Sequence, residues 1–241
     1  MKATHWEFEN RALLFGMVFT LGFVLYFLDP RNFATALAEW LGHRLHFTNL
    51  NISGDGIVLL LLALGAVLLV AAALLRTWAS SFLHANVVYA PEVQTAVLVA
   101  DGPYQRVRNP LYFANILMAV GMGMLMSRAG FFAALLTMTV FCYRLILREE
   151  ADLQASQGER YMAYCRAVPR LWPSLRQRLG SSGRKPSWAA GFKAEFWYWG
   201  FAAGMIAFAL TLNFKLFFAI TAASILWFWL SFWILQKKQG S

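Results

Sequence analysis

Two apolar segments joined by a short polar turn place the strongest constraint on the fold. Residues 111–126 are almost all apolar, Ser127-Arg128-Ala129-Gly130 has the composition of a tight turn, and residues 131–147 are apolar again. Neither segment has a polar face at helical spacing, which a helix at the surface of a water-soluble protein would need. The pattern predicts two antiparallel helices that cross a bilayer and bring the polar residues at their outer ends together.

The composition of the whole chain is that of a membrane protein. Of its 241 residues, 59% are hydrophobic and only 14% are charged, whereas about 25% of the residues in a typical soluble domain are charged. The net charge of +9 comes from Lys and Arg that gather beside apolar segments, between Arg144 and Lys193 and at Lys237-Lys238. Cytoplasmic loops of membrane proteins have this distribution. We therefore expect no nucleic-acid partner.

Four further apolar segments extend the prediction to about six transmembrane helices. They cover residues 12–28, 57–75, 196–212 and 216–235. Each is close to the ~20 residues needed to cross a hydrocarbon core of ~30 Å. We expect an all-α, polytopic membrane helix bundle with both termini in the cytoplasm, as in a bacterial inner membrane. The basic segment 149–187 then faces the cytoplasm, with a flexible break at residues 180–183.

The segments between these helices contain no pattern typical of a metal site. Residues 29–55 are expected to form an interfacial helix or an extracytoplasmic loop, and residues 80–100 a loop across the cytoplasmic mouth. The histidines and cysteines lack the spacing and the acidic partners of zinc ligands, so no metal is predicted at His43, His46, His84, Cys142 or Cys165.

The outer ends of the central hairpin carry groups suited to a charged ligand. Pro110 can begin a helix without losing a hydrogen bond. The amides of that helix N-terminus, with Arg106 and Arg108 nearby, favour a carboxylate or a phosphate. Glu149 and Glu150 follow the second apolar segment, and adjacent residues on a helix point about 100° apart. The two carboxylates are therefore expected to serve different partners.

The order of several motifs along residues 75–173 resembles one family of membrane enzymes. These motifs are Arg76-x-Trp78-Ala79, Gly102-Pro103-Tyr104, Val107-Arg108-Asn109-Pro110-x-Tyr112, Gly121-x-Gly123, Glu149-Glu150, Gly158-Glu159-x-Tyr161-x-x-Tyr164 and Val168-Pro169-Arg170. The order is similar to that of the isoprenylcysteine carboxyl methyltransferases and phospholipid N-methyltransferases. These are integral-membrane enzymes that use S-adenosylmethionine (SAM).

The resemblance implies a cytoplasmic-side SAM pocket in a methyltransferase core. The implied pocket residues are Tyr104, Arg108, Asn109, Tyr112, Gly121, Gly123, Glu149 and Glu150. SAM has a carboxylate that suits Arg or helix amides, an ammonium and a ribose diol that suit carboxylates, and an adenine that suits a flat apolar slot. The two glycines have an alternative interpretation, which is close packing between membrane helices.

Two positions depart from the family pattern. Asn109 stands where the family usually has His, and Asn can form hydrogen bonds but carries no proton at neutral pH. Ala114 stands where the family often has Gly.

Arg144, Arg148 and Glu150 are the candidate catalytic residues. Methyl transfer is an in-line displacement, in which holding two reactants in position supplies much of the catalysis. A carboxylate acceptor needs a cation, such as Arg144 or Arg76, and an amine acceptor needs a base such as Glu150. We expect Glu150 to be left unpaired by the protein and to matter more for the cofactor. Glu149 is expected to pair locally, on the Arg148 side of the helix or with the basic segment beyond it.

The predicted function is SAM-dependent methylation of a lipophilic acceptor that enters from the bilayer. The acceptor is an isoprenylcysteine-like carboxylate or a lipid headgroup. The alternatives are an NADPH-dependent reductase of the sterol-reductase type and a non-catalytic membrane protein. We divide the chain into N-terminal transmembrane helices with an extracytoplasmic loop (1–75), the methyltransferase core (76–175), and a linker with a C-terminal transmembrane hairpin (176–241).

Overall fold

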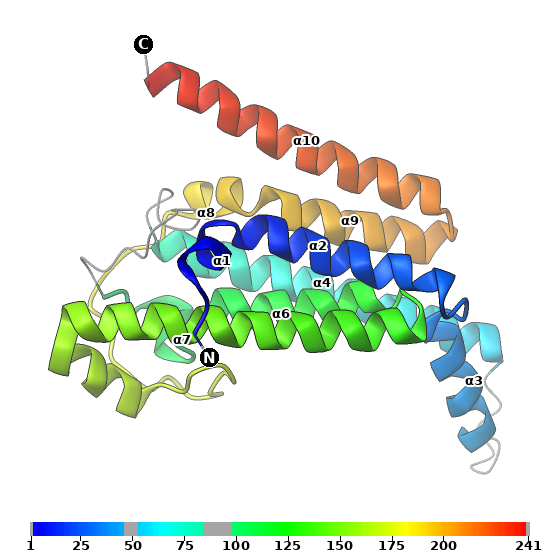
Figure 1. Cartoon of the computed structure of the whole chain (residues 1–241), viewed down its shortest axis with the longest axis horizontal. Coiled ribbons are helices and arrows are strands. Elements are labelled where there is room, and N and C mark those ends of the chain that lie inside the picture. Colours follow the sequence, from blue (N-terminus) through cyan, green and yellow to red (C-terminus); the bar gives the residue numbers. More distant parts are fainter. Residues whose placement is uncertain (1, 46–52, 84–97, 240–241) are drawn as a thin grey trace.

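The computed structural model describes residues 2–45, 53–83 and 98–239, and within them it contains helices and no β-strand (Figure 1). The prediction of an all-α protein is confirmed. The helices are α1 (His5–Glu9), α2 (Arg11–Val24), η1 (Leu25–Phe27), α3 (Phe33–Leu45), α4 (Gly54–Phe82), η3 (Gly102–Gln105), α6 (Pro110–Gly123), α7 (Arg128–Ala167), α8 (Trp188–Ala194), α9 (Phe196–Thr211) and α10 (Phe214–Gln239).

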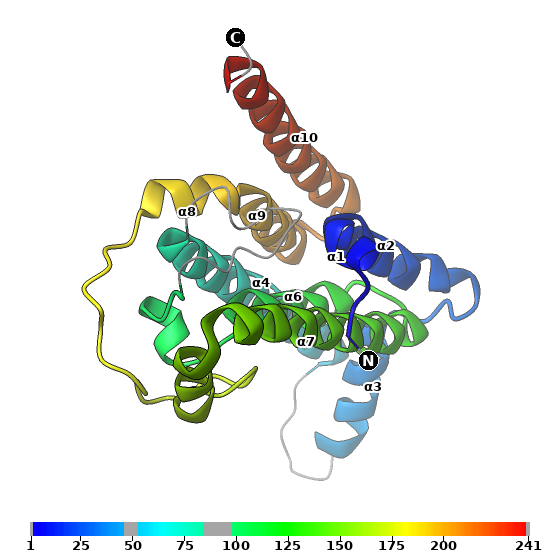
Figure 2. The ribbon, with the colours of Figure 1, turned by 60° about the vertical axis from the view of Figure 1, so that its left-hand side comes forward.

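Helix α4 lies at the centre of the bundle. It packs against α6 and α9 along its length, against α3 towards one end, and against α8 and η3 towards the other. Helix α7 packs on α6 and α2. Helix α10 packs on α9 and then leans away from the remaining helices (Figures 1 and 2). The boundary predicted after residue 75 falls inside α4, so the first two predicted parts share one helix.

The central hairpin forms as predicted, with a shifted turn. Its two arms are α6 and α7, and Ser127 caps α7 by accepting a hydrogen bond from the backbone N–H of Gly130 (3.0 Å). The turn therefore lies before Arg128, because a Ser at the N-cap starts a helix. By length and composition, α4 and α7 are able to cross a membrane. Shorter apolar helices lie at Arg11–Phe27, Pro110–Gly123, Phe196–Thr211 and Phe214–Leu230, where the other spans were predicted.

Glycines allow the central helices to approach closely. A Cβ atom on Gly121 would lie 2.9 Å from the carbonyl oxygen of Gly65, and a Cβ on Gly65 would lie 3.0 Å from that of Gly121. A Cβ on Gly123 would collide with the ring of Phe131. Helix packing, the second of the two interpretations of these glycines, accounts for both positions.

Helix α7 reverses direction at Gly158. The spacing of residues 151–166 is typical of a helix that continues the preceding one, but Gly158 has φ 52° and ψ −129°, which is non-helical. Figure 1 shows the turns that follow folded back beneath the long part of α7. Glycine populates this backbone region readily, whereas residues with a Cβ are strained there. The reversal brings Tyr161 and Tyr164 into the interior, at 2% and 6% exposure.

Residues 168–187, here called the strap, run back across the segment that precedes α6. The N–H of Arg108 donates to the carbonyl of Pro169 (2.9 Å), and the N–H of Ser174 donates to the carbonyl of Arg106 (2.9 Å). Further along, the N–H of Arg178 donates to the carbonyl of Gln105 (3.0 Å). The strap and residues 105–108, which precede α6, therefore run antiparallel and are joined by hydrogen bonds.

Asp101 binds the strap at residues 180–183, where a flexible break was predicted. Its carboxylate accepts hydrogen bonds from the Ser181 hydroxyl (2.9 Å), the Ser182 N–H (2.8 Å) and the Ser182 hydroxyl. Burial alone would raise the pKa of Asp101, but the donors of Ser182 and Ser181 outweigh it and lower the pKa below its ordinary value.

Some predicted features lie outside the described residues. They include the greater part of the loop expected at residues 80–100, together with His46 and His84, and the side chains of Lys237 and Lys238. Residues 80–82, the start of that expected loop, belong to α4 instead.

We predict that Gly158→Ala lowers the melting temperature of the detergent-purified protein. A Cβ at this position would meet no atom within 4 Å, so the cost arises from the backbone conformation and is about 1–3 kcal/mol. Gly180→Ala is the matched control, because its surroundings are equally open and its φ is not in the left-handed region. Equal melting temperatures for the two variants would contradict this account of the reversal.

Candidate cofactor and acceptor site

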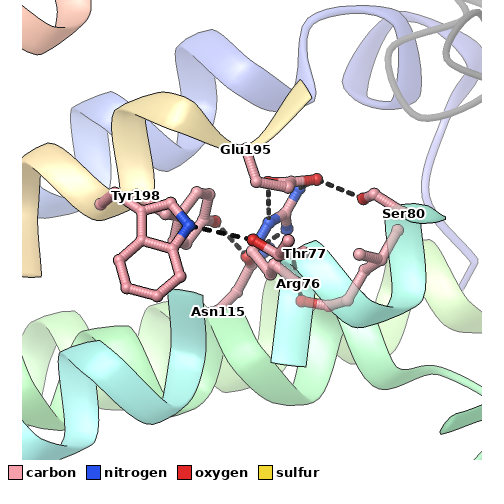
Figure 3. A network of polar contacts seen from close by, with 8 residues as sticks. Arg76, Thr77, Ser80, Asn115, Glu195 and Tyr198 are labelled. Carbon is pink, nitrogen blue, oxygen red and sulfur yellow. Dashed lines mark hydrogen bonds and ion pairs between the residues drawn. The ribbon is translucent and has the colours of Figure 1, made fainter. Parts of the chain in front are cut away.

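A buried ion pair joins α4 to the start of α9. Arg76 Nε lies 2.5 Å from Glu195 Oε2, and Arg76 Nη2 lies 3.1 Å from Glu195 Oε1. The two residues are only 6% and 0% exposed. The Ser80 hydroxyl donates to Glu195 Oε1 (2.6 Å). Figure 3 shows Arg76 and Glu195 facing each other between the helices.

The same arginine also binds α6. Arg76 Nη1 donates to Asn115 Oδ1 (2.8 Å), which also accepts a hydrogen bond from the Tyr198 hydroxyl. The guanidinium carbon lies 4.3 Å from the centre of the Tyr198 ring (Figure 3). Arg76 was a candidate cation for a carboxylate acceptor, but Glu195 of the protein itself supplies its carboxylate. The cluster therefore holds α4, α6 and α9 together.

Glu150 lies in a second cluster, beside the residues that lead into α6. Its carboxylate contacts Arg108 Nη2 (3.1 Å), Arg170 Nε (2.9 Å) and Asn109 Nδ2 (3.2 Å). Asn109 Nδ2 also donates to the carbonyl of Arg170 (3.0 Å). The expectation that the protein leaves Glu150 unpaired is therefore wrong. Its partners come from the loop before α6 and from the strap, which helical spacing on α7 does not reveal.

Glu149 has the opposite environment. The Tyr112 hydroxyl donates to Glu149 Oε1 (2.6 Å), and among the described residues no cation lies within ion-pair distance of this carboxylate. The expected local pairing of Glu149 on the Arg148 side is wrong. Of the two carboxylates, Glu149 has more capacity left for a cationic or diol-bearing ligand.

Arg144 and Arg148 share a face of α7, as their spacing predicts, but that face binds the N-terminal segment. Arg144 Nη2 lies 2.9 and 2.7 Å from the two carboxylate oxygens of Glu7, and Arg148 Nη1 donates to the carbonyl of Ala3 (3.2 Å). The N–H of Thr4 and the Arg144 guanidinium hold the pKa of Glu7 below its usual value. The fold does not bring the two predicted catalytic arginines to the Glu150 cluster.

Tyr104 lies within the electrostatic influence of the Arg76–Glu195 pair and of Glu149. The residue is 8% exposed, and its carbonyl accepts a hydrogen bond from the Tyr164 hydroxyl (2.8 Å). Burial raises the pKa of Tyr104, the negative charges of Glu149 and Glu195 raise it further, and Arg76 acts against them. The Tyr104 hydroxyl therefore stays protonated and can donate a hydrogen bond.

Two buried donors near the start of α6 are without a protein acceptor among the described residues. They are Arg108 Nε and Gln105 Nε2. Arg144 Nε and Arg148 Nε, on the face of α7 that binds the N-terminal segment, are in the same condition. Buried polar groups in native proteins nearly always have a partner, so Arg108 Nε and Gln105 Nε2 are able to donate to a ligand or to water. A guanidinium N–H fits the carboxylate of SAM, and the carboxylate of Glu149 fits its ammonium or its ribose hydroxyls. The donors and acceptors present are therefore of the kinds that SAM requires.

The fold gathers six of the eight predicted cofactor residues at one end of the central hairpin. These are Tyr104, Arg108, Asn109, Tyr112, Glu149 and Glu150. Gly121 lies nine residues beyond Tyr112, which is about 13 Å along a helix, and Gly123 lies further still. The glycines serve helix packing there and do not belong to the gathered group.

Sequence reasoning missed two partners in these clusters. Arg170 belonged to one of the family motifs but was not assigned to the site, and the pairing of Arg76 with Glu195 was not anticipated. A signal for the second pair was available. Arg76 and Glu195 each lie at the end of an apolar segment. Charges in such positions are costly to bury unless they form an ion pair with each other.

Comparison with known proteins supports the expected family. The model of the phospholipid methyltransferase family matches residues 60–160. This match agrees with the family that the order of the motifs resembles. The matched segment contains Arg76, Arg108 and both Glu149 and Glu150, whereas Arg170 and Glu195 lie outside it.

Two curated relatives match parts of the chain. The cobalt-zinc-cadmium resistance protein CzcN of Cupriavidus metallidurans is 28% identical over 123 residues, which are 51% of this chain and 54% of the relative. The nickel-cobalt-cadmium resistance protein NccN of Alcaligenes xylosoxydans xylosoxydans is 26% identical over 100 residues, which are 42% and 44%. The chain thus spans about half the length of the curated relatives it matches. No solved structure matches the chain significantly.

We predict that Glu195→Ala destabilises the protein far more than removal of an exposed carboxylate. Arg76 would remain buried without its counter-charge, at a cost of about 3–5 kcal/mol. Glu159→Ala is the control, because the Glu159 side chain is 91% exposed and lies 3.7 Å from Arg166, and such pairs contribute about 0–1 kcal/mol. Thermal melting in detergent measures both variants. Comparable losses would show that the Arg76–Glu195 pair does not hold the helices together.

Proposed function

We propose that this chain is an integral-membrane methyltransferase that uses SAM and acts on a lipophilic acceptor. One observation carries the proposal. The fold gathers six residues of the family motifs, which are separated by up to 46 positions in the sequence, at one end of the central hairpin. The family match over residues 60–160 and the two long apolar helices support the same conclusion.

The gathered residues have complementary roles in the proposed site. Arg108 Nε would bind the carboxylate of SAM, and Glu149 would bind its ammonium or ribose, because these are the buried donor and the carboxylate with capacity left. Tyr112 holds Glu149 through its hydroxyl, and Glu150 holds Arg108. When bound, SAM supplies the electrophilic methyl group. The protein's part is to position the reactants and to exclude water from the buried end of the hairpin.

The acceptor is proposed as a lipid headgroup or an isoprenylcysteine-like carboxylate that approaches from the bilayer. Both curated relatives are named for resistance to metal ions. In the described part of the chain no three His, Cys, Asp or Glu side chains are grouped as a metal ion would require. Binding of a metal ion by this chain is therefore not part of the proposal.

Equilibrium binding of SAM and of NADPH to the detergent-purified protein tests the proposal. We expect SAM to bind and NADPH not to bind. NADPH binding without SAM binding would favour a reductase of the sterol-reductase type. The phosphates of NADPH would need the same arginines. Binding of neither would indicate a non-catalytic membrane protein.

We predict that Glu149→Gln weakens SAM binding at least tenfold with little change in melting temperature. A hydrogen bond to a charged group contributes about 1.5–3 kcal/mol, or roughly 10- to 150-fold in affinity. Glu150→Gln should lower the melting temperature more, because it removes the carboxylate between Arg108 and Arg170. Isothermal titration with SAM measures the first effect. Unchanged SAM affinity in Glu149→Gln would exclude Glu149 from the cofactor site.

We further predict six membrane spans, with both termini and the strap in the cytoplasm. Single cysteines at Gly180 and Arg31, in a background with Cys142 and Cys165 replaced by Ala, test this in intact cells. A membrane-impermeant thiol reagent should label the cysteine at position 31 and leave position 180 unlabelled. The reverse result would invert the proposed orientation, and labelling of both positions would require a different number of spans.

A further inference from the structure

A row of exposed apolar side chains runs along α7 towards the candidate site. Phe132 is 63% exposed, Leu136 67%, Val140 43% and Tyr143 42%. Their spacing of four, four and three residues places them on one face of the helix. The row covers 11 residues, which is about 16 Å along a helix and close to half of a ~30 Å hydrocarbon core. Its length therefore fits one acyl chain in one leaflet.

Arg170 of the strap lies at the Tyr143 end of this row. Its Nη1 donates to the Tyr143 hydroxyl (2.8 Å), and its Nε donates to Glu150 (2.9 Å). The Arg170 side chain is 37% exposed, and its Nη2 has no protein acceptor among the described residues. The guanidinium is thus fixed on two sides and presents free N–H groups on a third.

Exposed aromatic and apolar residues flank the arginine. The ring of Trp172 is 5.7 Å from that of Phe113 in the first turn of α6, and Trp172 is 74% exposed. Leu175, further along the strap, is 95% exposed. Trp beside a cation is typical of the boundary between hydrocarbon and headgroups. The strap therefore presents both an apolar and a cationic side chain at the level where α6 begins.

The local charge also favours an anionic partner. Arg108 and Arg170 share the single carboxylate of Glu150, so this group of three carries a net positive charge. The other arginines considered for the acceptor have carboxylates of their own, because Arg76 pairs with Glu195 and Arg144 pairs with Glu7. Arg170 differs from them, because it is exposed and also shares its carboxylate partner with a second arginine.

We propose that Arg170, Tyr143, Trp172 and Phe113 form a subsite for the anionic headgroup of a lipid whose chain lies along Phe132, Leu136 and Val140. The headgroup is a phosphate or a carboxylate, which the free N–H groups of Arg170 bind. The inference rests on the proposed function in one respect, since it makes an anionic lipid the acceptor. The position beside Glu150 presents that headgroup to the cofactor end of the hairpin.

Native mass spectrometry of the full-length protein in detergent tests this subsite with phosphatidylglycerol and phosphatidylcholine as probes. The wild type should retain phosphatidylglycerol at least tenfold more than phosphatidylcholine. Arg170→Gln should abolish the preference, and Arg170→Lys should reduce it, because an ammonium cannot reach Glu150, Tyr143 and a headgroup together. Arg176→Gln is the matched control, being an exposed arginine of the same strap that makes no described side-chain contact, and it should keep the preference.

Three outcomes would overturn the inference. They are a preference that survives in both Arg170 variants, an equal loss in Arg176→Gln, and complete displacement of the lipid by inorganic phosphate, which would indicate a site for small anions. The melting temperature of each variant identifies misfolding, and Arg170→Lys decides if Arg170→Gln does not fold. SAM titration in parallel separates the two proposals. A wild type that selects phosphatidylglycerol but binds no SAM refutes the proposed function alone.

Discussion

Buried charge is the constraint on which the rest of this structure depends. A guanidinium or carboxylate at the end of an apolar helix is stable only when it is paired and hydrogen-bonded. Two clusters in this chain meet that requirement, one formed by Arg76 and Glu195 and the other by Arg108, Glu150 and Arg170. Each cluster joins elements distant in sequence, so the same contacts that neutralise the charges also assemble the candidate site.

The two clusters leave different residues available for a ligand. In the first, all partners are supplied by protein, and the guanidinium is covered by the Tyr198 ring. In the second, two guanidiniums share one carboxylate, and the neighbouring carboxylate of Glu149 has a hydroxyl as its partner. A cation-binding and an anion-binding group thus lie side by side at the second cluster. The proposed cofactor, whose amino-acid end carries both an ammonium and a carboxylate, and the proposed anionic acceptor need that combination.

Much of the fold followed from the sequence because apolar length and periodicity are local properties. The hairpin of α6 and α7, the apolar part of α4 and the all-α class depend on residues within one segment, and they were predicted correctly, although α4 extends beyond the predicted end at residue 75. The reversal at Gly158 and the course of the strap depend on single backbone conformations and on hydrogen bonds between distant segments. Neither a glycine in open surroundings nor a run of serines gives a local sequence signal that predicts such contacts.

The candidate site was predictable as a set of residues but not as a set of pairings. The motifs identified six residues that the fold gathers, yet the pairings expected for Glu149 and Glu150 were reversed. Helical spacing compared Glu150 only with other residues on α7, whereas its partners, Arg108 and Arg170, come from outside that helix. Arg144 and Arg148 were placed on a common face correctly, but the N-terminal segment that covers this face could not be inferred from spacing.

Asn109 shows how a departure from the family pattern fits this arrangement. Its amide nitrogen carries two N–H groups, and it donates both, to Glu150 (3.2 Å) and to the carbonyl of Arg170 (3.0 Å). A neutral histidine has one N–H group, and its second nitrogen is an acceptor, so it could donate only one of these two bonds. Asn109 donates both from a side chain that does not titrate. In this chain the position therefore links the start of α6 to the strap and holds Arg170 beside Glu150, which is a positioning role that requires no titration.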